Sequence, residues 1–184
     1  MLSLALSFVL HGAPLAINNG DFIGWTADGE TYAWSSTQPD GSRVIEWRSP
    51  ASATGEVFIV EEGGKPGPGA LKYDEWKKTH PLTKAARVEG VTTTIKVDGK
   101  PNTTFGGTGK AFKLELIAEK GKAKATGKSL FVDAFGKKLR KGTVAPFVDP
   151  TGRRVVFVIA FEDGKGEPKG STGELIEVAL PEAK

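Results

Sequence analysis

The chain of 184 residues offers few side chains suited to nucleophilic or acid-base catalysis. It has no cysteine, which excludes disulfides, thiol nucleophiles and thiolate metal sites. Of its two histidines, His80 is the one outside the N-terminal segment, and no G-x-S-x-G sequence accompanies it. We interpret His80 as a residue at a helix end, where a cation interacts favourably with the last carbonyl groups. We therefore expect no catalytic residue from these types.

The acidic residues lack the local spacing of a metal site. Asp-Gly pairs begin at Asp28, Asp40, Asp98 and Asp163 without the alternating acids of a calcium loop, so we interpret each pair as a turn. The run "EDGKGE" could bind calcium weakly, but a solvated hairpin loop explains it better. "GGTGK" at 106–110 resembles the end of a phosphate loop, yet Ala follows the Lys instead of Ser or Thr. We expect neither a metal nor a cofactor.

Paired carboxylates for glycoside hydrolysis leave no local trace in a sequence, because folding brings distant acids together. Glu61 and Glu62 are adjacent, and neighbours on a strand face opposite sides, so these two do not form such a pair by themselves. A carboxylate-based glycan hydrolase therefore stays open as an alternative function.

The basic residues are concentrated in the middle of the chain. Residues 96–141 hold 12 Lys or Arg against 4 Asp or Glu, whereas the whole chain has a net charge of +3. The densest cluster, "GKKLRKG", is a candidate binding loop for an anionic partner, although lysines at a hairpin tip also serve solubility. Its basic residues are Lys137, Lys138, Arg140 and Lys141.

Three tryptophans lie close together in the N-terminal third of the chain. Trp25, Trp34 and Trp47 fall in consecutive apolar runs that read as strands. On one face of a sheet they could stack sugars or a partner chain, so we include them as candidate binding residues. Aromatic cross-strand pairs also stabilise an ordinary core, which is the interpretation we favour.

The N-terminal segment predicts export. "MLSLALSFVLHGAPLA" joins an apolar run of about ten residues to a helix-breaking segment; the run is too short to span a bilayer but suits a signal peptide. We expect a signal peptide at 1–16, a single β-rich domain at 17–184, no transmembrane span and a secreted or periplasmic location. A buried first strand of a cytosolic domain is the alternative.

The fold class follows from turns and alternation. With 24 Gly and 11 Pro, the chain favours a mostly β fold of about ten antiparallel strands, arranged as a sandwich or an open barrel. Residues 70–79 predict one short helix, which Pro81 ends. Apolar runs predict a meander through "FIGW", "TYAW", "RVIEW" and "EVFIVE", and "RVVFVIAF" at 154–161 predicts a central strand covered on both faces.

"FIGWTADGETYAW" and "PFVDPTGRRVVFV" share one form, an apolar run, a turn with Gly and a β-branched run, and we interpret them as two similar hairpins. "GWTADGETYAW" resembles the strand-turn-strand element of TolB-type propeller repeats. The order of the strand segments is similar to that of predicted secreted bacterial proteins of unknown function. The resemblance implies export and β structure but no functional residue. A complete propeller is not expected, because it needs at least four four-stranded blades.

These observations favour a non-enzymatic, exported β-rich protein of the bacterial envelope that binds a macromolecular or anionic partner. Export leaves an anionic envelope polymer or a protein as the expected partner, and no nucleic acid. The alternatives are the glycan hydrolase and a structural or assembly subunit of an envelope complex. Oligomeric state is not predicted by any of these features.

Overall fold

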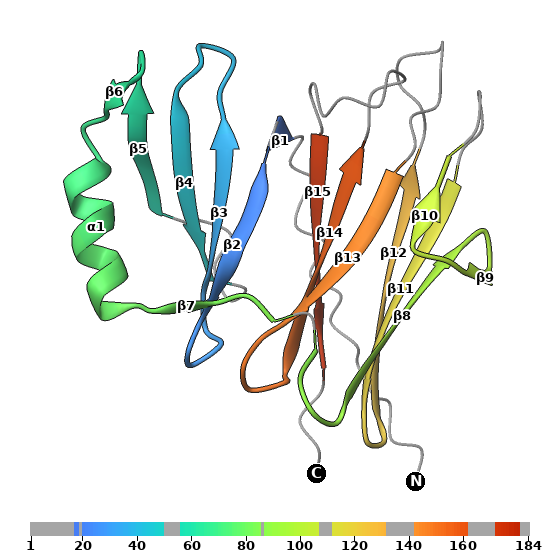
Figure 1. Ribbon diagram of the computed structural model, residues 1–184. Helices are drawn as coiled ribbons and strands as arrows, with labels where there is room; N and C mark the ends of the chain where they lie inside the picture. The colour runs from blue at the N-terminus through green and yellow to red at the C-terminus, as the bar shows by residue number, and fades with distance from the viewer. Residues whose placement is uncertain are drawn as a thin grey trace, which may run out of the picture.

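The computed structural model describes residues 17–18, 20–49, 56–85, 87–106, 112–131, 142–161 and 172–180. Within these ranges the chain forms antiparallel sheets with one short helix, which confirms the predicted fold class (Figure 1). Ten of the described strands have six or more residues. The expected signal peptide at 1–16 lies outside the described residues.

The first sheet has six strands and contains the predicted meander. Its order is β6-β5-β4-β3-β2-β7, and α1 packs on one of its faces. A turn with Gly41 in the left-handed region joins two of its strands. The long strands are β2 (Asp21–Thr26), β3 (Tyr32–Thr37), β4 (Arg43–Arg48) and β5 (Glu56–Glu62), and the short elements are β6 (Lys65–Pro66), α1 (Ala70–Thr79) and β7 (Leu82–Thr83).

The second and third sheets are built from the rest of the described chain. The five-stranded sheet has the order β1-β15-β14-β13-β10, and the four-stranded sheet has the order β12-β11-β8-β9. The five-stranded sheet comprises β1 (Ile17–Asn18), β10 (Thr104–Phe105), β13 (Gly142–Val148), β14 (Arg154–Phe161) and β15 (Thr172–Ala179). The four-stranded sheet comprises β8 (Val91–Val97), β9 (Lys100–Pro101), β11 (Phe112–Lys120) and β12 (Ala123–Phe131).

The five-stranded sheet is the middle layer, and its central strand is buried from both sides. Along β14, Val155 and Phe157 pack in one core cluster with residues of the four-stranded sheet. Val156, between them, packs in a second cluster with aromatic residues of the six-stranded sheet. This arrangement confirms the prediction for "RVVFVIAF", because side chains alternate between the two faces of a strand and both faces here are apolar.

The two similar hairpins identified in the sequence are packed against each other. In the β2–β3 hairpin, Phe22 stacks on Phe147 of the β13–β14 hairpin, with ring centroids 4.6 Å apart. At the turns, Arg154 donates from Nη1 to the carbonyl oxygen of Gly29 at 2.5 Å. The middle layer is thus joined to the six-stranded sheet by both apolar packing and a turn-to-turn contact.

Candidate functional site

The three candidate tryptophans do not share one face. Trp25 and Trp34 are fully buried between the six-stranded and five-stranded sheets, and Trp25 donates from Nε1 to the Phe147 carbonyl oxygen at 3.2 Å. Trp47 packs on the opposite face of the six-stranded sheet, toward α1. In this structure Trp25 and Trp34 have no surface on which a ligand could stack, which agrees with the favoured core interpretation.

Trp47 belongs to an aromatic group at the C-terminal end of α1. The His80 ring stacks on Trp76 at 4.7 Å between centroids, and Trp47 contacts both rings at 5.0 and 4.3 Å. His80 caps the helix: its backbone N–H donates to the carbonyl oxygen of Trp76, and its Nδ1 lies 2.9 Å from Oγ1 of Thr79. The position at the helix end matches the interpretation of His80 from the sequence.

The described Asp side chains of the Asp-Gly pairs accept hydrogen bonds from other residues of the chain. Thr26 donates from Oγ1 to Asp28 at 2.6 Å, and this bond lowers the pKa of the Asp28 carboxyl below its ordinary value. At Asp40, the hydrogen bond donated by the Ser42 backbone N–H lowers the pKa in the same direction. Asp98 accepts a hydrogen bond from the Lys113 backbone N–H at 2.9 Å. Asp163 lies outside the described residues.

Asp149 is the one buried carboxylate in the part of the chain that the structure describes. Its oxygens accept hydrogen bonds from Oγ1 and the backbone N–H of Thr151 and from the backbone N–H groups of Arg153 and Arg154. These donors pair the carboxylate with its own hairpin turn, so Asp149 is a structural residue. Over the described ranges, no group of three or more His, Cys, Asp or Glu could hold a metal ion.

The basic loop with Lys137, Lys138, Arg140 and Lys141 lies outside the described residues. Several lysines of the four-stranded sheet lie among the described residues, and some of them are available to bind an anion. Lys100, Lys113 and Lys122 are exposed, and no described residue forms an ion pair with them. Lys96 and Lys124 instead pair with Glu115 and Glu119, respectively, at 3.2 and 2.9 Å.

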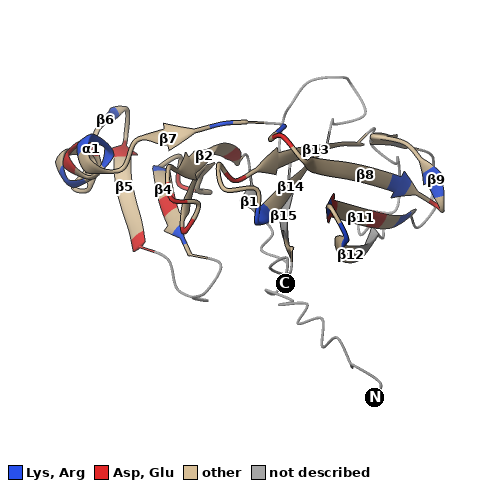
Figure 2. Ribbon diagram, turned by 90° about the horizontal axis from the view of Figure 1, so that it is seen from below, with Lys and Arg blue, Asp and Glu red and all other residues tan. Residues whose placement is uncertain are grey.

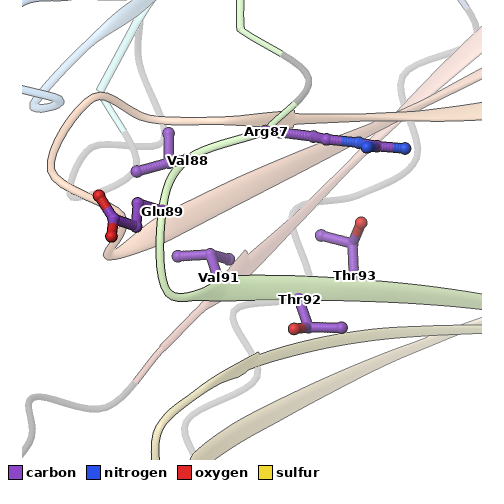
Figure 3. A pocket seen from close by; sticks show the side chains of 6 residues that line it. All are labelled: Arg87, Val88, Glu89, Val91, Thr92 and Thr93. Atoms are coloured by element: carbon purple, nitrogen blue, oxygen red, sulfur yellow. The ribbon is translucent and has the colours of Figure 1, made fainter.

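A hollow of about 490 Å³ opens where the connection from β7 enters β8. Arg87 and Thr93 lie in the bend between this connection and the strand, whereas Glu89 points away on the other side (Figure 3). The Arg87 side chain is exposed and forms no hydrogen bond or ion pair with another described residue. The described lining consists of Arg87, Val88, Glu89, Val91, Thr92 and Thr93.

Reasoning from the sequence did not identify this hollow. Arg87 stands alone in "AARVEGV" and belongs to no run of basic residues, so the charge distribution gave no signal for it. The one available signal is Gly90, a turn residue that bends the chain between Arg87 and the threonines of β8. Such a turn is common on any surface and does not by itself indicate a binding site.

Comparison with known proteins gave no match: no family model, no curated protein and no solved structure matches the chain. The resemblance of "GWTADGETYAW" to TolB-type repeats therefore remains an expectation from the residues. Among the described elements, α1 with its ten residues included, no helix is long and apolar enough to cross a membrane.

Proposed function

We propose that this protein is an exported, non-enzymatic binding module whose partner is an anionic polymer of the bacterial envelope. The observation that carries the proposal is a separation of charge between two sheets. The described residues of 91–131 hold seven lysines and three acids, whereas those of 20–85 hold seven Lys or Arg and ten acids. The apolar segment at 1–16, which we expect to be a signal peptide, supports the export part of the proposal.

The two charged regions occupy opposite ends of the layered molecule. Figure 2 shows the four-stranded sheet at one end and the six-stranded sheet at the other, with the five-stranded sheet between them. Charges separated in this way do not neutralise each other across a core, since solvent screens exposed charges over about 10 Å. The four-stranded sheet therefore presents a net positive surface that can attract an extended anion.

The described carboxyl groups support the glycan hydrolase less well than the binding module. A general acid needs a raised pKa, whereas hydrogen bonds lower the pKa of Asp28 and Asp40. Asp149, which is fully buried, is committed to its hairpin turn.

An assembly subunit is a second candidate, favoured by one observation. Val57 and Ile59 alternate along β5 and thus share a face, with 56% and 38% of their surface exposed. If this face binds a protein partner or a second copy, V57D should weaken complex formation in sedimentation of the full chain. Unchanged sedimentation of V57D alongside an intact wild-type complex would exclude this face.

The main proposal is tested by co-sedimentation of the full chain with polygalacturonate, polyglycerol phosphate and uncharged dextran at two salt concentrations. We expect binding to an anionic polymer that weakens as salt rises, and no binding to dextran. The double variant K113Q/K122Q should bind less than K65Q/K78Q, which removes the same charge from the six-stranded end. Equal binding by both variants would exclude the four-stranded sheet as the binding surface.

A further inference from the structure

The hollow beside β8 contains a cationic group with no partner among the described residues. Arg87 carries five N–H donors in a planar fork that matches the two oxygens of a carboxylate. The nearest acid in the sequence, Glu89, points away from the bend that holds Arg87 (Figure 3). The positive charge of Arg87 is therefore available to an anion that enters the hollow.

The backbone around Arg87 is fixed on both sides. Before it, the carbonyl oxygen of Ala85 accepts a hydrogen bond from the Val148 backbone N–H at 3.0 Å. After it, Val91 donates to the carbonyl oxygen of Val88 at 3.1 Å across a turn in which Gly90 has φ 75°. Val88 and Val91 also pack on the core between the four-stranded and five-stranded sheets. A ligand would therefore meet a largely preformed site, which lowers the entropy cost of binding.

The rest of the hollow suits a sugar ring. Thr93, on the side of β8 that faces Arg87, brings a hydroxyl group that both donates and accepts hydrogen bonds, whereas Thr92 points to the other side of the strand (Figure 3). β9 pairs only with Lys96 and Val97, so the first half of β8 has no second neighbouring strand among the described residues. Its edge offers backbone donors and acceptors to a ligand. The apolar surface of Val91 can pack against the C–H groups of the ring, whereas Val88 lies on the same side of the connection as Glu89 (Figure 3).

We infer that this hollow is a subsite for one carboxylate-bearing sugar unit of an acidic polysaccharide. Arg87 binds the carboxylate through both oxygens, Thr93 binds a ring hydroxyl, and Val91 contacts the ring. A single guanidinium balances the single charge of a carboxylate, whereas a phosphate monoester carries nearly two charges. A phosphodiester also carries one charge, but it holds that charge on the linkage between units rather than on a ring that Thr93 and Val91 can contact. The inference rests on the proposed function and names the ligand class for it.

The test is calorimetric titration of the full chain with trigalacturonate, with maltotriose as the uncharged analogue and inorganic phosphate as the alternative anion. R87Q should weaken trigalacturonate binding about tenfold or more, because two charge-assisted hydrogen bonds are lost. R87K should give a smaller loss, since it keeps the charge without the fork. The control K65Q, on the six-stranded sheet, should leave the affinity unchanged.

A second readout separates this subsite from the wider proposal. NMR amide shifts on adding trigalacturonate should map to Thr92 and Thr93 in the wild type and disappear in R87Q. If R87Q binds both trigalacturonate and polygalacturonate like the wild type, the subsite is wrong while the proposed function stands. Maltotriose bound as tightly as trigalacturonate, or phosphate displacing it at equal concentration, would overturn the carboxylate assignment. Failure of every anionic polymer to bind would overturn the proposed function itself.

Discussion

A substitution at Gly29 is the most sensitive test of how the six-stranded and five-stranded sheets are joined, because Gly29 lies at the contact between the two hairpin turns. Gly29 has φ 68°, in the left-handed region, and its backbone carbonyl accepts the hydrogen bond from Arg154. A Cβ atom added at this position would lie 2.7 Å from Oδ1 of Asp149, which is closer than nonbonded carbon and oxygen atoms approach. G29A therefore adds a steric clash to an unfavourable backbone conformation.

The expected loss of stability has two parts. The left-handed backbone costs an alanine about 1–2 kcal/mol. The clash displaces Asp149 from its donors or Gly29 from Arg154, and losing one hydrogen bond to a charged group costs about 1.5–3 kcal/mol. The free energy of unfolding should therefore fall by about 2.5–5 kcal/mol in total.

Gly41 provides a matched control. It has φ 84°, also in the left-handed region, but no atom lies within 4 Å of an added Cβ. G41A should lose only the backbone part, about 1–2 kcal/mol. Urea denaturation followed by the fluorescence of the four tryptophans measures both variants. Equal losses in G29A and G41A would refute the idea that the turn-to-turn contact stabilises the fold.

Three further predictions concern the six-stranded sheet and α1. The pKa of the Asp28 carboxyl lies below its ordinary value of 3.8 in the folded chain, so the stability of the wild type should decrease as pH falls below that value. D28N should lose less stability in the same acid denaturation series. Identical curves for the two proteins would contradict this prediction. Burial raises the pKa of Tyr73 above its ordinary value of 10.0, so the stability of the wild type should decline as pH rises beyond that value. Melting curves at alkaline pH should show a smaller decline for Y73F. A steeper decline in Y73F would be inconsistent with a buried phenol. Trp76 is 8% exposed and Leu71 is 80% exposed, so W76A should lower the free energy of unfolding by about 3–5 kcal/mol and L71A by less than about 0.5 kcal/mol in urea; similar losses would mean that α1 packs differently.

The strands and the helix were predictable because local patterns determine them. The apolar run of "RVVFVIAF" is too continuous for a strand with one wet face, and it lies in the middle layer. The Asp98-Gly99 turn has positive φ at both residues, as the short connection between β8 and β9 requires. Pro81 follows the end of α1, as expected from its effect on the preceding residue.

The faces of the tryptophans depended on register, which the sequence pattern does not specify. An irregularity between Phe22 and Gly24 interrupts the alternation in β2, so Phe22 and Trp25 pack in the same cluster although they are three residues apart. Trp47 pairs with Ala33 rather than Trp34, which directs it toward α1. One changed register position is enough to exchange the two faces of a strand.

The hollow could not be predicted because its residues acquire meaning only in three dimensions. Arg87 and Thr93 are six positions apart, and only the turn at Gly90 brings them to the same bend. The charge separation, in contrast, was visible in the sequence as a basic middle and acidic remainder. The structure adds that the described lysines of this middle segment lie in one sheet at one end of the molecule.

The most direct measurement is the affinity of the full chain for polygalacturonate over a series of salt concentrations. If the four-stranded sheet binds an anionic polymer, the logarithm of the association constant should fall linearly with the logarithm of the salt concentration, and K113Q/K122Q should give a shallower slope. Binding that does not change with salt, or that is equally strong for dextran, would contradict the proposed function.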